Sequence, residues 1–436
     1  MNKKRSRLRN VFIGVGLTLG MIGAGIAYIF SGAIIPIPKP GGPNLIGFST
    51  TTIIDPSRMN TQNTPRVITL DLWYPASSID GLKAAPYSES ALNKMLEKYQ
   101  GIPASVGGET PSFAFQNAPV LPGSHPTVIF NHGYGSFSKQ NASNFQELAS
   151  HGYFVISIAH PGDSLIARDG QNRLLEFDPT DSVYRRLSVA QKEPGYAQTL
   201  AIKLEAQRNA KTSLEYANAS RELAQTLPYS ELEPIKQRWL EDTLFVIRSL
   251  SQAAQPKILE ATNANEITVI GHSLGGIVAL EVAKNPPAGV RRVIDLDGSW
   301  LEYDSTQNGS TQNGSTQNSS SENAQIRVPM LAMLSTQNTI QNQDLGLHGT
   351  FDSLLKRTSS NTHVIEIAGT AHFNFTDLNF IPILKRFAPL LGDVDNKRMA
   401  SLQNQAIFEF LKRDPASPKS LLPTSNEIKQ TFFPAC

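Results

Sequence analysis

The sequence predicts an α/β fold in which a mostly parallel central sheet carries helices on both faces. Eight apolar, β-branched runs end in turn residues and are typical of strands, at 46–54, 65–74, 126–131, 153–159, 266–270, 291–297, 327–335 and 362–368. Apolar residues at helical spacing occupy 91–100 and 237–250. Strands that alternate with helices indicate a parallel sheet, whereas the first two strands lack a helix between them and should pair antiparallel.

Length and composition exclude several classes of protein. The 436 residues suffice for one large α/β domain or two smaller ones. Five of the 39 basic residues lie in the first ten positions, and the remaining 34 stand against 37 acidic residues, so no nucleic-acid footprint exists. The single cysteine, Cys436, excludes an intrachain disulfide and a cysteine-based metal site, and the eight histidines lack metal-ligand spacing. We therefore expect no metal and no organic cofactor.

The N-terminal segment predicts a membrane anchor. A basic cluster at 1–10 precedes an uncharged, apolar run of 25 residues at 11–35. A bilayer-spanning helix needs about 20 apolar residues, whereas a cleaved signal has an apolar core of about 7–15, so we favour an uncleaved signal anchor. The basic flank should stay in the cytoplasm, which places the rest of the chain outside. Cleavage, the alternative, would give a secreted protein.

The soluble part is predicted to be one domain, 46–436, joined to the anchor by a proline-rich linker at 36–45. Within it, 165–236 is a long, polar, mostly helical insertion that could form a cap over the strand ends or a peripheral decoration. A second segment, 304–323, contains the tandem repeat STQNG-STQNG-STQNS, which cannot bury a core and should be a disordered surface loop.

The stretch "TVIGHSLGGIVAL" predicts a nucleophile elbow. Gly271-x-Ser273-x-Gly275 lies between a β-type run and a second apolar run of helical character. Because glycine lacks Cβ, strand and helix can approach closely and the strained turn is tolerated. Ser273 would then stand exposed above the sheet, beside the positive end of the following helix. An ordinary loop is the alternative, but the strand–turn–helix context is the one that the motif requires.

A serine nucleophile needs a general base, and His372 is our candidate. In α/β-hydrolases this histidine follows the last strand, and Gly369-Thr370-Ala371-His372 follows the run 362–368. The four weaker candidates are His363 at the other end of that strand, His272 within the elbow, and His132 and His160 at the ends of other strands.

The acid that orients the base should come from the segment Val293–Gly298. It offers Asp295 and Asp297 on the same strand face. We favour Asp297 because it is nearer the carboxyl end of the strand and is followed by the turn residue Gly298. A buried structural role is the alternative for either carboxylate.

The turn after 126–131 is the candidate oxyanion hole. The sequence there is Asn131-His132-Gly133-Tyr134-Gly135-Ser136, a glycine-rich turn that can present backbone amides. The N–H groups of Tyr134 and of Leu274, the residue after the nucleophile, are the expected pair of donors.

These motifs together resemble the plasma-type platelet-activating factor acetylhydrolase family. "VIFNHGYGSF", "GHSLGG", "LDGSW" and "GTAHFNFTDL" occur in that family's order, and "DLWYPA" and "APYSES" look like its early segments. The resemblance covers roughly residues 45–385, and its most specific part is His-x-Asn-Phe-x-Asp at 372–377.

The resemblance implies an α/β-hydrolase fold and a triad of Ser273, Asp297 and His372, with Tyr134 and Leu274 as oxyanion donors. The implied activity is a serine ester hydrolase that cleaves short acyl esters of lipid-like substrates. A general carboxylesterase or lipase is the first alternative, and a hydrolase-fold binding protein without turnover is the second. The insertion, the repeat loop and the anchor depart from the family pattern and leave substrate specificity open.

Overall fold

The computed structural model describes most of the chain between its N-terminal segment and its last residue. The described ranges are 35–59, 63–100, 110–171, 173–178, 229–252, 255–298, 325–335, 359–381, 391–414 and 417–435, with isolated positions at 104 and between 195 and 222. The predicted repeat loop 304–323, the middle of the predicted insertion and residues 1–34 lie outside them. Among the described residues, no helix is both long and apolar enough to cross a membrane.

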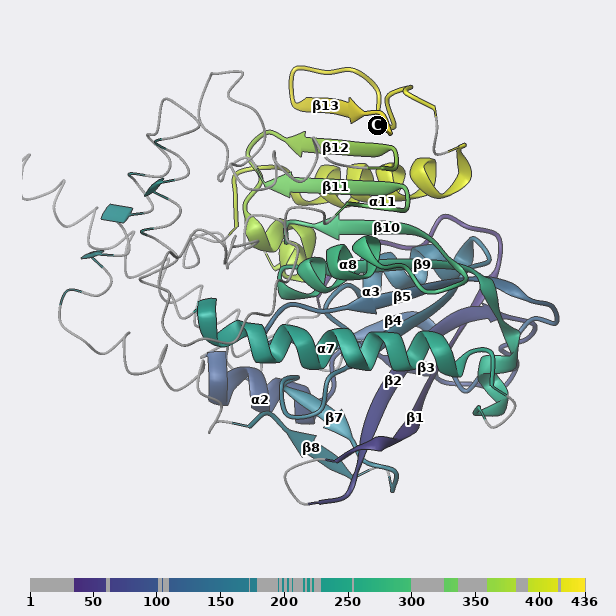
Figure 1. Cartoon of the computed structure of the whole chain (residues 1–436). Coiled ribbons are helices and arrows are strands. Elements are labelled where there is room, and N and C mark those ends of the chain that lie inside the picture. Colours follow the sequence, from purple (N-terminus) through teal and green to yellow (C-terminus); the bar gives the residue numbers. More distant parts are fainter. Residues whose placement is uncertain are drawn as a thin grey trace, which may run out of the picture.

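One large sheet dominates the fold (Figure 1), in the strand order β13-β12-β11-β10-β9-β5-β6-β2-β1-β4-β3. Its strands are β1 (Leu45–Met59), β2 (Pro65–Ala76), β3 (Ala84–Pro86), β4 (Pro111–Gln116), β5 (His125–Asn131), β6 (Phe154–Ala159), β9 (Thr262–His272), β10 (Val290–Leu296), β11 (Met330–Ser335), β12 (Thr362–Ile367) and β13 (Ile428–Phe433). The six strands from β12 to β6 in this order are mutually parallel. The predicted parallel sheet and the predicted antiparallel pairing of β1 with β2 are therefore confirmed.

Helices cover both faces of the sheet, as expected. The α-helices are α2 (Ser90–Gln100), α3 (Ala142–Ser150), α7 (Tyr229–Ser249), α8 (Leu274–Lys284) and α11 (Asn396–Lys412), and the 3₁₀ helices are η1 (Lys257–Ala261), η6 (His372–Phe375) and η7 (Asp377–Phe380). Alternation along β5 sends Val128 and Phe130 into the core with α3 and α11, while Ile129 enters the core with α7 and α8. Figure 1 shows the two pairs of helices on opposite sides of the sheet.

The start of the predicted helical insertion 165–236 differs from the prediction. Two short strands, β7 (Ile166–Arg168) and β8 (Leu174–Glu176), pair antiparallel there. Leu165, Ile166 and Phe177 are buried in a cluster with Leu92 of α2. This apolar contact outweighs the polar, helix-favouring composition of the segment as a whole. Most of the residues that could form the predicted cap over the strand ends lie outside the described ranges.

The predicted linker 36–45 is a docked part of the domain. Gly41 donates its N–H to the Glu147 carboxylate at 2.8 Å, and Gly42 donates to Ser150 Oγ at 3.0 Å. A Cβ on Gly42 would lie only 2.3 Å from the Ser150 carbonyl carbon, so this approach needs glycine. The segment therefore satisfies polar groups at the C-terminal end of α3, a contact made by the backbone that leaves no side-chain pattern.

Candidate active site

Ser273 occupies a strained turn between β9 and α8. Its φ of 57° and ψ of −123° are uncommon for a residue with a side chain. A Cβ on Gly271 would lie 1.9 Å from the Gly275 carbonyl oxygen, and a Cβ on Gly275 would lie 2.1 Å from the Asn131 carbonyl oxygen. Both glycines of the motif are thus required for the close approach of β9, α8 and β5. The turn leaves Ser273 partly exposed while its neighbours His272 and Leu274 are buried.

The structure brings Asp297 and His372 together. Asp297 follows β10, and His372 begins η6 after β12. The imidazole Nδ1–H of His372 donates to Asp297 Oδ2 at 2.7 Å, and the Ser335 N–H donates to Asp297 Oδ1 at 2.7 Å. Burial alone would raise the pKa of Asp297, but hydrogen bonds from His372 and Ser335 outweigh it and hold that pKa below its ordinary value. Asp297 is therefore an ionised partner that fixes one imidazole tautomer.

Asp295 faces a different part of the elbow. It is fully buried, and its Oδ1 accepts the Gly298 N–H at 2.8 Å. The same oxygen lies 2.2 Å from the position that a Cβ on Gly276 would take, so it packs against the first turn of α8. These contacts favour a buried structural role for Asp295, the alternative that the sequence analysis left open.

His272 packs directly beneath the base candidate. Its ring lies 4.6 Å from that of His372, and its Nε2 is 3.1 Å from the His372 carbonyl oxygen. A carbonyl can only accept, so Nε2 of His272 carries the proton. Burial, with repulsion from His372, lowers the pKa of His272 to about 3. His272 is therefore neutral and supports the loop that carries His372.

The glycine-rich turn after β5 contacts the elbow. A Cβ on Gly133 would lie 3.3 Å from both Ser273 Cβ and His272 Nδ1. The turn is closed by the Ser136 N–H on the Gly133 carbonyl at 3.1 Å. Tyr134 follows this point of contact, and Leu274 supplies the first amide of α8, which has no acceptor within its helix. Leu274 is therefore adjacent to Ser273 in the chain, and Tyr134 lines the same cavity as Ser273.

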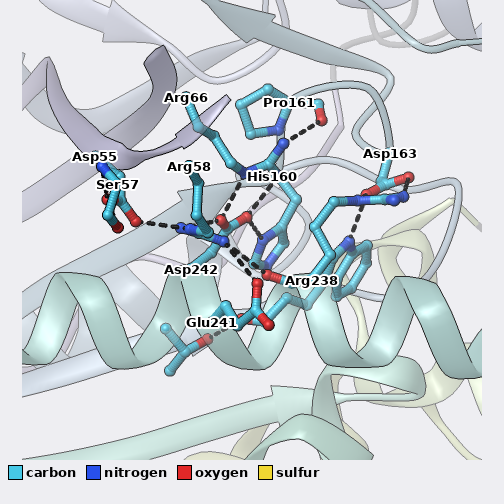
Figure 2. Close-up of polar contacts among 12 residues, drawn as sticks. Asp55, Ser57, Arg58, Arg66, His160, Pro161, Asp163, Arg238, Glu241 and Asp242 are labelled. Atoms are coloured by element: carbon cyan, nitrogen blue, oxygen red, sulfur yellow. Dashed lines mark hydrogen bonds and ion pairs between the residues drawn. The ribbon is translucent and has the colours of Figure 1, made fainter. Parts of the chain in front are cut away.

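The other candidate histidines lie in closed surroundings. His160 is fully buried, donates from Nδ1 to Asp242 Oδ2 at 2.9 Å and stacks on Trp239 with ring centres 4.1 Å apart. It belongs to a cluster of ion pairs between β1, β2 and α7 that Figure 2 shows. His132 is also fully buried, and burial lowers its pKa to about 3. His363 packs on Phe432 at the opposite end of the sheet.

A small cavity opens beside Ser273. It holds about 80 Å³ and is lined on its apolar side by Leu92, Leu96, Phe137, Phe373 and Ile381. Its polar wall includes Gln140 and Asp377, two buried residues that the sequence analysis did not single out as functional. Asp377 ends the family-like motif 372–377, which could have drawn attention to it. Among the described residues, no cluster of acidic, histidine or cysteine side chains could hold a metal ion.

Comparison with known proteins gives a family and a fold. The family model described as "Platelet-activating factor acetylhydrolase, isoform II" matches residues 56–420. The platelet-activating factor acetylhydrolase of Canis lupus familiaris is 25% identical over 389 residues, covering 86% of this chain and 77% of the relative. The acetylhydrolase of Cavia porcellus is 23% identical, covering 78% and 68% respectively.

A solved structure gives independent support for the architecture. The ferulic acid esterase from Streptomyces cinnamoneus superimposes with a TM-score of 0.62 at 19% identity, covering 90% of this chain and 98% of that structure. The likeness establishes an α/β-hydrolase-like fold, in agreement with the sheet order and the strand–elbow–helix turn.

Proposed function

The chain belongs to the platelet-activating factor acetylhydrolase, isoform II, family and is a carboxylic ester hydrolase, and on this premise we propose that Ser273, Asp297 and His372 are its catalytic triad. The observation that carries the proposal is the 2.7 Å hydrogen bond between His372 and Asp297, on a loop that packs over the strained elbow of Ser273. Family membership argues against the alternative of a binding protein without turnover.

The chemistry follows from the hydrogen bonds of the imidazole. Because Nδ1 of His372 donates to Asp297, Nε2 is left with a lone pair that can accept the hydroxyl proton of Ser273. Ser273 Oγ then attacks the ester carbonyl and forms an acyl-enzyme, while His372 returns the proton to the leaving alcohol. Water, activated by the same imidazole, releases the acid and restores the serine.

The negative charge on the carbonyl oxygen needs fixed donors. We assign these to the N–H groups of Tyr134, on the glycine-rich turn that lines the same cavity as Ser273, and of Leu274 at the start of α8. The N-terminal end of α8 adds a positive dipole at the same place. Preorganised donors of this kind contribute roughly 10²–10³-fold to the rate each.

The substrate class is inferred from the cavity and from the relatives. Relatives named as platelet-activating factor acetylhydrolases support a lipid-like ester with a short acyl group. The cavity of about 80 Å³ beside Ser273, closed by Leu92, Phe137 and Phe373, is suited to a short chain. A general carboxylesterase or lipase with a long-chain preference is the alternative outcome of the test on acyl length.

The location of the enzyme also stays a proposal, based on the sequence of 11–35. We propose that this segment anchors the chain in a membrane with the catalytic domain on the extracytoplasmic side, or is cleaved to release it. Full-length protein should sediment with membranes, whereas a chain that begins at Ile35 and keeps the segment docked on α3 should not. Recovery of the native protein without its first 30 to 40 residues would favour cleavage.

Substitution of Ser273 tests the triad directly. Ser273→Ala should lose measurable turnover of p-nitrophenyl acetate and all covalent labelling by a fluorophosphonate probe, because only the residual effect of the oxyanion hole and binding remains. Ser49→Ala is the matched control, since Ser49 is also partly exposed but lies on β1. Wild-type turnover by folded Ser273→Ala protein would refute the assignment.

A further inference from the structure

Asp377 ends the loop that carries His372 and is buried against the first turn of α3. Only 2% of the residue is exposed. Its Oδ2 accepts the backbone N–H of Ser143 at 2.9 Å, and its Oδ1 accepts the Ser143 hydroxyl. The Tyr87 hydroxyl and the Ala142 N–H also act on this carboxyl group and oppose the rise of its pKa. The carboxylate thus binds α3 through both donors of Ser143.

The helix that Asp377 meets has no cap of its own. Asn141 holds the N-cap position of α3, but its side chain makes no capping hydrogen bond. Its Nδ2 instead donates to the Phe375 carbonyl at 2.6 Å, within the loop that carries His372. The N–H of Ser143, in the first helical turn, is therefore satisfied by a carboxylate that is 234 positions away in the sequence.

The same contact reaches the oxyanion turn through Gln140. The Gln140 carbonyl accepts the Asp377 N–H at 3.0 Å, and its side-chain Oε1 accepts the Gly133 N–H at 3.0 Å. Gly133 in turn contacts Ser273. Gln140, just before α3, thus connects the loop that carries His372 to the glycine-rich turn of the proposed oxyanion donors.

The loop itself is internally fixed. The side-chain Oδ1 of Asn374 accepts the Ala371 N–H at 2.7 Å and the Gly392 N–H at 2.8 Å. Residues 371–377 are therefore held together, and Asn141 and Asp377 attach them to α3. Burial raises the pKa of Asp377 to about 7, against the opposing hydrogen bonds from Ser143.

We infer that Asp377 is a positioning residue, which locks the loop 371–377 onto α3 and thereby sets the place of His372 relative to Ser273 and the oxyanion turn. The inference rests on the proposed triad and adds to it a residue that borders the cavity beside Ser273 but acts on the reaction through the position of His372. Misplacement of a catalytic group by about 1 Å can reduce the rate by about 10²-fold.

The test is Asp377→Asn, which keeps the size of the side chain but places an NH₂ donor at one of the two positions where a carboxylate oxygen accepts from Ser143. We expect kcat to fall by roughly 10–100-fold with KM within about twofold, and fluorophosphonate labelling of Ser273 to slow in parallel. Asp55→Asn is the matched control. Asp55 is equally buried at 2% and bound to Ser57 and Arg58, so its loss should lower the melting temperature and leave kcat per folded molecule unchanged.

A second variant covers the case in which Asp377→Asn fails to fold. Ser143→Ala removes the hydroxyl donor and keeps the N–H donor, so it should give a smaller fall in kcat that is not additive with Asp377→Asn. Normal kcat and labelling in folded Asp377→Asn, or in Ser143→Ala if only that variant folds, would overturn the inference. If Ser273→Ala is inactive in the same assays, only the inference fails; if Ser273→Ala is active, the triad itself is wrong.

Discussion

The molecule contains two aspartate–histidine pairs that look alike at the level of one hydrogen bond. His372 Nδ1 donates to Asp297 at 2.7 Å, and His160 Nδ1 donates to Asp242 at 2.9 Å. Both histidines follow strands of the parallel region, β12 and β6 respectively, so both belong to the edge of the sheet at which active sites form. Only their surroundings distinguish a candidate base from a structural residue.

Protein side chains enclose Asp242 completely, so its pair with His160 has no access to substrate. Arg66 binds the carboxylate through two hydrogen bonds of 2.7 Å, and Arg58 forms an ion pair with it at 2.8 Å (Figure 2). Trp239 stacks on the ring of His160. The Nε2 of His160 lies 3.1 Å from Asn131 Oδ1. Burial lowers the pKa of His160 despite its hydrogen bond with Asp242. This pair ties α7 to β2 and to the end of β5.

The pair Asp297–His372 differs in access. The His372 side chain is 15% exposed, whereas that of His160 is completely buried. His372 also lies on a loop that packs over the elbow of Ser273. We propose that a carboxylate–imidazole pair can take part in catalysis only where its second ring nitrogen has access to a nucleophile and to substrate.

The largest contrast between the pairs should come from removing the carboxylate of the pair that we propose to be catalytic, Asp297–His372. Asp297→Asn should lower kcat by about 10⁴-fold, because an amide stabilises the wrong imidazole tautomer. Steady-state hydrolysis of p-nitrophenyl acetate at pH 7 measures it. Asp295→Asn, which alters a carboxylate bound to Gly298, should lose much less activity. A crippled Asp295→Asn beside an active Asp297→Asn would show that the two roles are reversed.

The same substitution in the structural pair should act on stability. Asp242→Asn leaves Arg66 and Arg58 without their shared buried partner, which should reduce the free energy of unfolding by about 3–5 kcal/mol. Urea unfolding measures this loss, and active-site titration gives the folded fraction. The kcat per titrated site should stay within a few-fold of wild type. A fall in kcat as large as that of Asp297→Asn would mean that the Asp242 cluster also controls the chemistry.

The sequence could predict the parts of the fold that its local patterns specify. The parallel central strands contain apolar, mostly β-branched runs such as TVIF in β5 and ITVI in β9, and Gly271-x-Ser273-x-Gly275 requires a tight strand-to-helix turn. The preference for Asp297 over Asp295 followed from its place at the end of its strand, and the structure puts Asp297 beside His372.

Features that depend on distant partners could not be predicted in this way. The edge strand β13 and β4, which lies next to the other edge, are short or partly exposed, so their sequences IKQTFF and PSFAFQ carry only weak strand patterns. The contact of Asp377 with Ser143 joins positions 234 residues apart and uses a backbone N–H, which no motif encodes. The docking of Gly41 and Gly42 on α3 has the same origin.

The buried neutral histidines predict a loss of stability in mild acid. The folded-state pKa of His132 and that of His272 are lowered to about 3, whereas a histidine in the unfolded chain has a pKa of about 6.5. Between these values the unfolded state binds more protons, so the stability is complete above about pH 6.5 and declines as the pH falls below it. At pH 5 each histidine should cost about 2 kcal/mol relative to pH 7.

Urea unfolding at pH 7 and pH 5 measures this difference, with His132→Gln as the comparison. Glutamine keeps a polar side chain but does not titrate, so the loss between the two pH values should shrink by about 2 kcal/mol. An unchanged pH dependence in His132→Gln would show that His132 is already protonated, or not buried, in the folded protein.

The smallest expected effect concerns the preference for acyl chain length, which we attribute to the cavity beside Ser273. In a series of p-nitrophenyl esters, kcat/KM should be highest at about two to four acyl carbons, because Leu92 and Phe137 close the cavity. Leu92→Ala should raise the ratio of hexanoate to acetate hydrolysis by about tenfold, since one or two methylenes in an apolar pocket are worth about 1–3 kcal/mol. Leu402→Ala, an equally buried change on α11, should lower stability without altering that ratio. An optimum at eight carbons or more, with activation at an oil–water interface, would instead favour a lipase.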